Sequence, residues 1–412
     1  MGSIWILNQY AQPPAFPGGT RHYELARRLV RTGHEVTVIC SSFHHSSRTR
    51  RHQGFHTMTE RVDGVQFVWL SARTSYQRNG VARALNMAEF ALRAWLEGRR
   101  CYGASAKPPI AIIGTSPHLL AAWAGFRLSR KFRVPFVFEI RDLWPETFVE
   151  MGLLSKRHPV VWLLHLLEAR LVRGAKRLIT LLPRVEDYLR SRKLPSEHVV
   201  VIPNGVDSDA FACAAVEETH GPARIIYVGA HGPANGLSNV LEAARELQED
   251  TACEFHLFGA GPEKGRLVNR AEQLGLSNVA FHDAVPKSEV PRVLCGADFL
   301  LLNYAPIGIG RYGISPNKLW EYMAAGRPVV FAHDAVNNPV HDAQCGVCVE
   351  PGSPEQLAGA VRKLCRMPVA ERQAMGERGS EYAREHHDWE QLAERLDVVI
   401  RELAGLSERA AD

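Results

Sequence analysis

The sequence predicts an α/β protein built from two Rossmann-like domains, each a parallel sheet covered by helices. The 412 residues exceed one ordinary core and fit two domains of about 200 residues each. Apolar runs of strand length alternate with helical patterns along the chain, which is typical of parallel sheets with helical crossovers. The same alternation starts again after a turn at 202–207, so the second half repeats the pattern of the first.

The first half should form one domain, at 1–203. Leu25, Leu29 and Val30 form an apolar stripe on its first helix, and Gly33 ends that helix before the next strand. Pro, Asn-Gly and Asp within 202–207 are typical of a turn, and we place the interdomain hinge just after it. The strands are predicted at Ile4–Asn8, Glu35–Cys40, Val65–Leu70, Ile110–Gly114, Val134–Ile140, Arg177–Thr180 and Val199–Ile202.

The second half should form another domain, at 204–388, followed by one helix from Trp389 to about Leu403. That helix carries Leu392, Leu396 and Val399 on one apolar side, so we expect it to dock on a domain, with the first domain as one option. The strands of this half are predicted at Arg224–Gly229, Glu254–Gly259, Val279–His282, Phe299–Leu302 and Val329–Ala332.

Charge divides unevenly between the halves. Residues 1–200 carry 30 Lys and Arg against 14 Asp and Glu, whereas residues 201–412 carry 19 against 30. The basic excess suits an anionic membrane surface or a phosphorylated acceptor, and it is too dispersed over an enzyme-like domain to favour nucleic acid. The helical run 85–96, with arginines around it, fits either an ordinary surface helix or membrane contact. No apolar run approaches the roughly 18 residues that span a bilayer, so we expect a cytoplasmic protein, peripheral at most.

Glycine-rich turns that follow predicted strands are the first candidate binding features. Gly18 and Gly19 precede a helix whose first N–H groups could bind an anion, with Arg21 within reach, although a plain tight turn explains the same residues. A second such turn begins at Gly229, and a third spans 259–261. None is a full dinucleotide fingerprint, because no acidic residue is clearly placed for a ribose.

The strongest motif spans 313–330 and is predicted to be loop, helix, turn and strand. Ser315 suits a helix N-cap and Pro316 the first helical position. Lys318 and Glu321 lie three residues apart near the positive end of that helix, where a phosphate is attracted and a carboxylate can accept sugar hydroxyls. A Lys–Glu surface pair is the alternative interpretation.

These residues resemble the family-4 retaining glycosyltransferases of GT-B fold. The resemblance rests on Ser315–Val330, the Pro-Asn-Gly-Val-Asp turn at 203–207, and Gly18-Gly19-Thr20-Arg21 with Gly33-His-Glu-Val36, and it covers nearly the whole chain. It implies two Rossmann-like domains facing across a cleft that holds a nucleotide-sugar. The segment Phe138–Pro145 resembles the branch that transfers N-acetylated deoxyamino sugars such as fucosamine in surface-polysaccharide assembly.

The resemblance implies roles for individual residues. Glu321 matches the glutamate that holds the donor ribose, and Gly18 and Gly19 match the loop that admits the donor phosphates. His118 matches the histidine that faces the transferred sugar, although a helix-start histidine with a local bond is the alternative. The donor is expected to be UDP-linked, without a metal or other cofactor, and a lone Cys345-Gly-Val-Cys348 does not make a metal site.

Three positions depart from the family pattern. Gly313 stands where the family has its first glutamate, which contacts the transferred sugar, and Ala230 and Asn235 stand where it has a phosphate-binding Arg and Lys. Something else must neutralise the diphosphate. We expect Lys318 to do so. The backbone N–H groups of the segment Ser315, Pro316 and Asn317, in which proline has none, and the side chain of Arg311 should assist it.

The acceptor side and the reaction follow from the same resemblance. It implies same-face transfer with the leaving diphosphate helping to deprotonate a glycolipid or saccharide acceptor, which enters from the first domain. Arg21, Arg141 and Asp142 are candidates there, and Arg141 with Asp142 could equally be a structural pair. Two other functions remain open at this point: a nucleotide-sugar 2-epimerase of the same architecture, and a non-catalytic homologue that lost the three usual residues.

Overall fold

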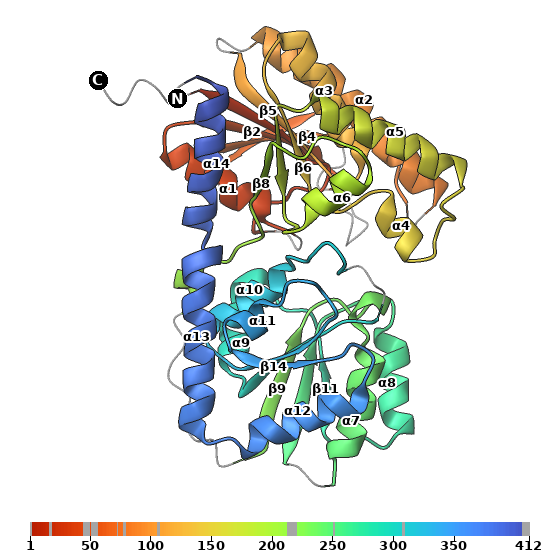
Figure 1. Ribbon diagram of the computed structural model, residues 1–412, viewed down its shortest axis with the longest axis vertical. Helices are drawn as coiled ribbons and strands as arrows, with labels where there is room; N and C mark the ends of the chain where they lie inside the picture. The colour runs from red at the N-terminus through yellow and green to blue at the C-terminus, as the bar shows by residue number, and fades with distance from the viewer. Residues whose placement is uncertain are drawn as a thin grey trace. The chain divides into compact units, whose positions relative to one another are not determined.

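The computed structural model of the chain forms two compact units (Figure 1). Unit 1 comprises Met1–Pro203 and Trp389–Asp412, and unit 2 comprises Asn204–Asp388. Each unit has its own sheet flanked by helices, which confirms the predicted α/β class. The residues that the structure describes are 2–15, 19–43, 50, 57–71, 73–76, 80–104, 108–211, 221–249, 252–306 and 310–405.

The sheet of unit 1 has the strand order β3-β4-β2-β1-β5-β6-β7-β8. Its strands pair in parallel except for β3 with β4, which are antiparallel. The central strands are buried on both faces, which explains why they are continuous apolar runs. The strand bounds are β1 Ser3–Leu7, β2 Glu35–Ser41, β3 Met58–Val62, β4 Val65–Leu70, β5 Pro109–Thr115, β6 Phe136–Ile140, β7 Arg177–Thr180 and β8 Val199–Val201.

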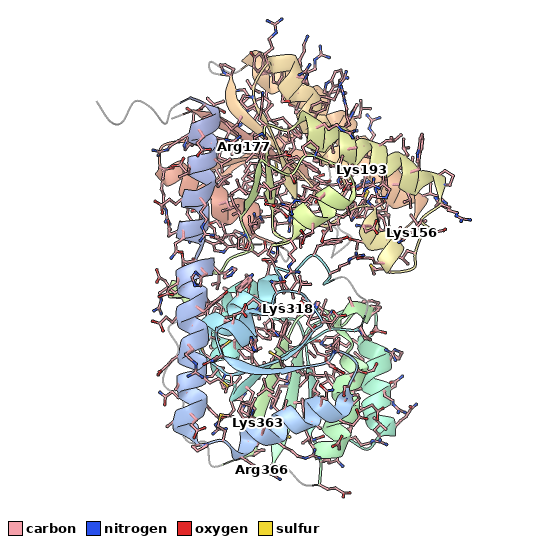
Figure 2. All side chains as sticks on the ribbon, in the orientation of Figure 1. Lys156, Arg177, Lys193, Lys318, Lys363 and Arg366 are labelled. Carbon is pink, nitrogen blue, oxygen red and sulfur yellow. The ribbon has the colours of Figure 1, made fainter. Side chains whose placement is uncertain are left out.

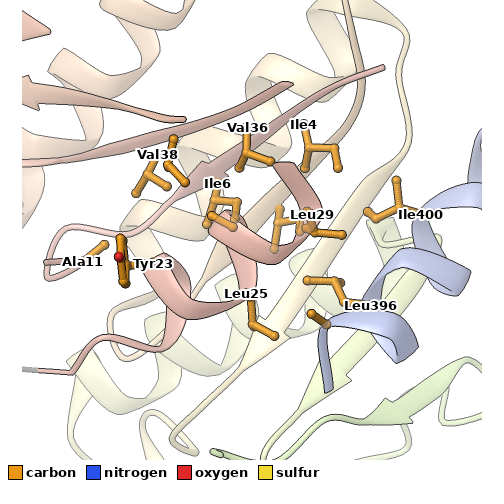
Figure 3. Close-up of a cluster of buried hydrophobic side chains, with 14 of the residues drawn as sticks. Ile4, Ile6, Ala11, Tyr23, Leu25, Leu29, Val36, Val38, Leu396 and Ile400 are labelled. Carbon is orange, nitrogen blue, oxygen red and sulfur yellow. The ribbon is translucent and has the colours of Figure 1, made fainter. Parts of the chain in front are cut away.

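Helices cover both faces of this sheet. The helices α1 (Arg21–Arg31) and α14 (Trp389–Leu403) pack against one face, where Ile4, Leu29 and Leu396 meet in one apolar cluster (Figure 3). On the other face lie α2 (Val81–Ala104) and α3 (Leu119–Phe132), and α5 (Pro159–Gly174) packs against α3. Two short helices complete the unit, α4 (Glu146–Glu150) and α6 (Val185–Ser191). The last helix of the chain therefore belongs to the core of unit 1.

The strand β3 is absent from the sequence prediction. It is short, alternates in exposure and joins β4 through Asp63 and Gly64, whose φ angles are 47° and 82°. Positive φ at both positions is the geometry of a tight hairpin turn, for which Asp-Gly is a preferred pair. The dipeptide was therefore an available signal for this hairpin.

The sheet of unit 2 has the order β11-β10-β9-β12-β13-β14, and its strands pair in parallel. Two apolar clusters, one on each face, contain Phe255 with Leu241 and Leu300 with Trp320. The edge strand β14 is absent from the prediction. The strand bounds are β9 Ala223–Val228, β10 Cys253–Phe258, β11 Val279–His282, β12 Phe299–Asn303, β13 Val329–Ala332 and β14 Gly346–Val349.

Most helices of unit 2 connect successive strands of this sheet, whereas α13 (Val369–His387) follows the last strand and ends the unit. The connecting helices include α10 (Asn317–Ala324) and the short helices η2 (Pro233–Asn235) and η3 (Lys287–Glu289). Within the described ranges, no helix has both the length and the hydropathy to cross a membrane. The remaining helices are η1 Ser208–Phe211, α7 Leu237–Leu247, α8 Lys264–Gln273, α9 Val290–Cys295, α11 Pro339–Asp342 and α12 Pro354–Arg366.

Candidate functional site

The helix α10 starts one residue later than the sequence predicts. Pro316 is its N-cap, with φ −73° and ψ 135°, and Asn317 is its first residue. The Ser315 hydroxyl does not cap the helix; it accepts hydrogen bonds from the Asn204 backbone N–H at 2.8 Å and from Trp320 Nε1 at 3.3 Å. This corrects the N-cap prediction, because Ser315 ties the start of α10 to the 204–207 turn instead.

Lys318, labelled in Figure 2, lies in the first turn of α10, and its side chain contacts Tyr227 near the end of β9. Its Nζ donates to the Tyr227 hydroxyl and to Asn235 Oδ1, both at 2.9 Å, and lies 4.6 Å from the Tyr227 ring centroid. An ammonium group has three N–H donors, so two are used and one is left for a ligand. We call Lys318, Tyr227 and Asn235 the lysine cluster.

Burial lowers the pKa of Lys318 to about 8, and nearby Glu321 only partly offsets this effect. The group is therefore still mostly protonated at neutral pH. Its neighbours Tyr227 and Asn235 are neutral side chains, so its positive charge is not cancelled by direct contact with a carboxylate. A partly dehydrated cation without a paired anion is suited to binding an anionic ligand.

The turn after β9 is shaped around this cluster. A Cβ at Gly229 would overlap the Lys318 ammonium, so any other residue there would require the lysine side chain to shift. The Ala230 carbonyl accepts from the Tyr227 hydroxyl at 2.7 Å and from Asn235 Nδ2 at 2.9 Å, which orients both partners of the lysine. The family pattern has an arginine and a lysine at the positions of Ala230 and Asn235. In this chain, these two residues instead help to position Lys318, which α10 supplies.

Glu321 and Lys318 do not form the surface pair that the sequence left open. The Glu321 carboxylate pairs with Lys287 Nζ from η3, and its side chain is only 13% exposed. No sequence pattern pointed to Lys287, which lies 34 residues away. The helix α10 therefore carries both the Glu321 carboxylate and the Lys318 ammonium, each with its own partners.

Gly313 adopts a φ of 99°, and its N–H donates to the Gly310 carbonyl at 3.0 Å. A glutamate at this position would be strained, because side-chain-bearing residues rarely adopt such a φ. Arg311 is exposed, with its guanidinium 5.3 Å from the Tyr312 ring centroid. The structure therefore gives Arg311 no direct contact with the lysine cluster.

The Arg21 side chain is committed to the interior of unit 1. It is 1% exposed, and its Nε donates to Glu139 Oε1 at 2.8 Å. Its Nη1 and Nη2 donate to the carbonyls of Pro203 and Ile202 at 2.5 and 2.8 Å. This corrects the prediction that Arg21 reaches an anionic ligand. Gly19 lies just before α1, whereas Gly18 is outside the described residues.

Glu139 holds Arg21 and a second basic residue together. Its Oε2 lies 2.7 Å from His22 Nε2. Burial alone would raise the pKa of Glu139, but Arg21 and His22 outweigh this effect and hold its pKa well below the usual range. We call Arg21, His22 and Glu139 the arginine cluster. It is a closed ion pair network that fixes α1 to β6 and to the end of unit 1.

His118 is the N-cap of α3 and is 1% exposed. Its Nδ1 accepts the Ala121 N–H at 3.3 Å, so the local-bond interpretation is correct for that nitrogen. Burial, together with the charge of Arg83, lowers the pKa of His118 to about 3, and the ring is neutral at physiological pH. The proton must then reside on Nε2, a buried donor with no partner among the described residues. The Nδ1 of this side chain is therefore structural, and its buried Nε2 is the nitrogen with no hydrogen-bond partner among the described residues.

Arg141 and Asp142 follow the end of β6. Their backbone N–H groups donate to the Ser116 hydroxyl at 2.8 and 3.2 Å. Their side chains form no close ion pair within the described residues, although the two opposite charges attract each other. The Arg141 Nε is buried and has no hydrogen-bond partner among the described residues. Likewise, no group of three or more His, Cys, Asp or Glu in the described ranges could hold a metal ion.

Comparisons with known proteins agree with this architecture. Residues 18–205 match the glycosyl transferase 4-like domain, and residues 222–367 match the domain of glycosyl transferases group 1. The chain is 26% identical over 369 residues, 84% of its length and 88% of the relative's, to the Escherichia coli K12 protein WcaI, which is named for glycosyl transfer in colanic acid biosynthesis.

Solved structures show the same fold. Sucrose-phosphate synthase from Thermosynechococcus elongatus superimposes with a TM-score of 0.77 at 16% identity, covering 98% of this chain and 100% of that one. Anabaena HepE, solved with UDP-glucose, gives 0.67 at 15% identity, covering 97% and 99%. The two sheets and the two matched domains define a glycosyltransferase of GT-B fold. The chain belongs to the glycosyltransferases that join a 4-like domain to a group 1 domain.

Proposed function

We propose that this glycosyltransferase moves a sugar from a UDP-sugar to a lipid-linked or saccharide acceptor in polysaccharide biosynthesis, with retention of configuration. The observation that carries the proposal is the lysine cluster, in which Lys318 keeps one N–H donor and its charge beside Gly229. The bound UDP-glucose of HepE and the colanic acid pathway in the name of WcaI support the donor class and the biosynthetic setting.

Lys318 would stabilise the charge that develops on the leaving diphosphate. Electrostatic stabilisation at a site where charge develops is worth several kcal/mol in a partly dehydrated environment, about 3 for one well-placed donor. Glu321 would accept the ribose hydroxyls, with Lys287 holding the carboxylate in place. The N-acetylated amino sugar remains a proposal from the Phe138–Pro145 resemblance, and no metal or cofactor enters the mechanism.

In unit 1, His118 would contribute its Nε2–H to a substrate oxygen. The ring is held by its Nδ1 bond to Ala121 and cannot accept a proton near neutral pH, since its pKa is lowered to about 3. It therefore serves as a hydrogen-bond donor rather than as a general base. Arg141 and Asp142 are proposed for the acceptor, because both directly follow the end of β6 in the unit that we expect to receive it.

The test combines binding and turnover on the purified full chain. A thermal-shift panel of nucleoside diphosphates and UDP-sugars should show stabilisation by UDP, since a ligand at 100 times its Kd adds about 2.7 kcal/mol. Incubation of the stabilising donor with a saccharide acceptor should then release UDP and give a product of retained anomeric configuration, read by NMR.

Other outcomes would replace the proposal. Conversion of the donor to its epimer without any acceptor would identify a 2-epimerase. Stabilisation by UDP-sugars with neither hydrolysis nor transfer would identify a non-catalytic binding protein. If no nucleotide stabilises the chain, the proposal that it has a nucleotide-sugar donor site is wrong.

A further inference from the structure

The segment 151–173 of unit 1 exposes several large apolar side chains to solvent, at positions where polar side chains are usual on a protein surface. Trp162 is 65% exposed, Leu163 61% and Leu166 49%. Before α5, Met151 and Leu153 are 45% and 62% exposed. Single exposed apolar residues are ordinary, but five in one short segment indicate an interaction surface.

These residues share one face of α5. Pro159, Trp162, Leu163 and Leu166 are three and four residues apart, which places them on the same side of a helix. The opposite side carries Val161, Leu171 and Val172, which are buried in unit 1. The helix is thus apolar on both sides of its first half, and packing within unit 1 explains only one of them.

The charges around this face are mostly positive. Arg170 and Arg173 continue the exposed face of α5, and the Arg170 guanidinium lies 5.6 Å from the Phe126 ring centroid. Lys156, which Figure 2 labels, and Arg157 lie in the connection from α4. None of the four takes part in an ion pair within the described residues. The sole acidic residue of 151–173 is Glu168, which is 2% exposed and accepts from the Tyr188 hydroxyl at 2.8 Å.

The neighbouring helix α4 carries two acidic residues. Glu150 directly precedes Met151 and is partly buried. Glu146 is also partly buried, and its carboxylate lies 4.0 Å from His165. Glu168 also lies 3.9 Å from Arg192 and 3.4 Å from His165. The carboxylates of Glu146 and Glu168 are therefore directed to partners inside unit 1, which leaves Glu150 as one negative charge beside the four basic residues.

We propose that this surface, Met151, Leu153, Trp162, Leu163 and Leu166 with the four basic residues, docks on an anionic phospholipid bilayer. An exposed tryptophan among leucines suits the interfacial depth of a membrane, and unpaired Lys and Arg beside it suit anionic headgroups. A protein partner would need matched shape and acidic groups, whereas a bilayer needs only the apolar and basic chemistry seen here. The proposal serves the proposed transfer to a lipid-linked acceptor but is measured independently of it.

The helix α2 provides the matched control. Leu85 and Leu92 are 57% and 56% exposed, close to the values for Trp162 and Leu163. The basic residues of α2 differ in part, because Arg93 pairs with Glu89 at 2.8 Å and Arg100 with Glu97 at 3.4 Å, whereas the Arg99 guanidinium lies 4.8 Å from the Trp95 ring centroid. The two helices therefore expose similar apolar area, but two arginines of α2 are held by carboxylates, while Arg170 and Arg173 of α5 are in no ion pair within the described residues.

The experiment is co-sedimentation of the full chain with vesicles of equal parts phosphatidylcholine and phosphatidylglycerol, and with phosphatidylcholine alone. Wild-type protein should bind the mixed vesicles and lose binding in high salt. The double variant Trp162→Ser/Leu163→Ser should lower the partition coefficient by about tenfold or more, and Arg170→Gln/Arg173→Gln should abolish the preference for the anionic lipid. The control Leu85→Ser/Leu92→Ser should stay within about twofold of wild type.

Unchanged melting temperatures would show that each variant is folded, as expected for exposed side chains. Three results would overturn the proposal: no binding of wild type to mixed vesicles, an equal loss in the α2 control, or self-association of wild type that the α5 variant abolishes in the absence of lipid. The last result would assign the surface to a second copy of the chain. UDP binding by the same variants should be unchanged, so failure here is distinguishable from failure of the donor site.

Discussion

Each unit contains a buried or half-buried cation, and the two cations are used differently. In unit 1, Arg21 at the start of α1 is neutralised by Glu139 of β6. In unit 2, Lys318 reaches the end of β9 and is held by the neutral groups of Tyr227 and Asn235. The arginine cluster has satisfied its charge within the protein, whereas the lysine cluster has not.

Whether a buried cation is paired with a carboxylate distinguishes a structural role from a binding role better than its residue type does. A buried cation paired with a carboxylate and two carbonyls stabilises the fold and has little attraction left for a ligand. A cation held by neutral oxygens is oriented but keeps its charge, at the expense of a lowered pKa. We therefore regard the arginine cluster as a structural cluster that stabilises unit 1, and the lysine cluster as the candidate binding group of unit 2.

The largest expected effect breaks the arginine cluster. Glu139→Gln removes one charge and leaves Arg21 buried without its counter-ion, which should lower the free energy of unfolding of unit 1 by about 3 to 5 kcal/mol. Urea denaturation measures this change. Glu186→Gln, which removes the exposed partner of Arg190, is the matched control and should shift the value by less than about 0.5 kcal/mol. Equal small losses for both would show that Glu139 does not clamp the unit.

The second prediction concerns the carboxylate beside the lysine cluster. Glu321→Ala should remove two charge-assisted hydrogen bonds to the donor ribose and weaken UDP binding by about 2 to 4 kcal/mol. Calorimetry with UDP and with 2′,3′-dideoxy-UDP measures it, since the variant should bind both equally. A variant that keeps the wild-type preference for the ribose hydroxyls would move the ribose site elsewhere.

The third prediction converts one cluster into the other. Asn235→Asp would give Lys318 a carboxylate partner, as Glu139 does for Arg21, and the new charge would also repel a diphosphate. UDP affinity should fall by about tenfold, or about 1.4 kcal/mol. Calorimetry at several salt concentrations checks the electrostatic origin, because the loss should shrink as salt rises. Affinity equal to wild type would mean that the free charge of Lys318 is irrelevant to binding.

Sequence alone predicts most of the fold because parallel, doubly buried strands are continuous apolar runs bounded by Gly and Pro. The α/β class with two sheets is confirmed, and the last helix has its predicted bounds because Leu392, Leu396 and Val399 repeat at helical spacing. The edge strands β3 and β14 were not predicted from the sequence. One face of β3 is exposed, so its residues alternate or are polar and form no apolar run.

The candidate site is less accessible to sequence reasoning because its contacts join residues far apart in the chain. Lys318 could be selected from its place at a helix start, but Tyr227 lies 91 residues away and Asn235 lies 83 away. Arg21 also lies at a helix start near a glycine turn. Its contact with Glu139, 118 residues away, shows that its charge is already neutralised. Spacing identifies a cation near a glycine turn, whereas the fold decides whether that cation is free.

The central claim is that the free charge of Lys318 binds the donor diphosphate. Calorimetry of UDP and of uridine, with wild type, Lys318→Gln and the exposed-lysine control Lys363→Gln, tests it between pH 7 and about pH 9.5. Because the pKa of Lys318 is lowered to about 8, the group is charged below that pH and loses its charge above it.

At pH 7, Lys318→Gln should weaken UDP binding by about 1.5 to 3 kcal/mol and leave uridine binding unchanged, while Lys363→Gln matches wild type. The difference between wild type and Lys318→Gln should decline as the pH rises past about 8, and this comparison cancels any ionisation of the nucleotide itself. Equal losses for UDP and uridine, or a difference that does not change with pH, would contradict the account.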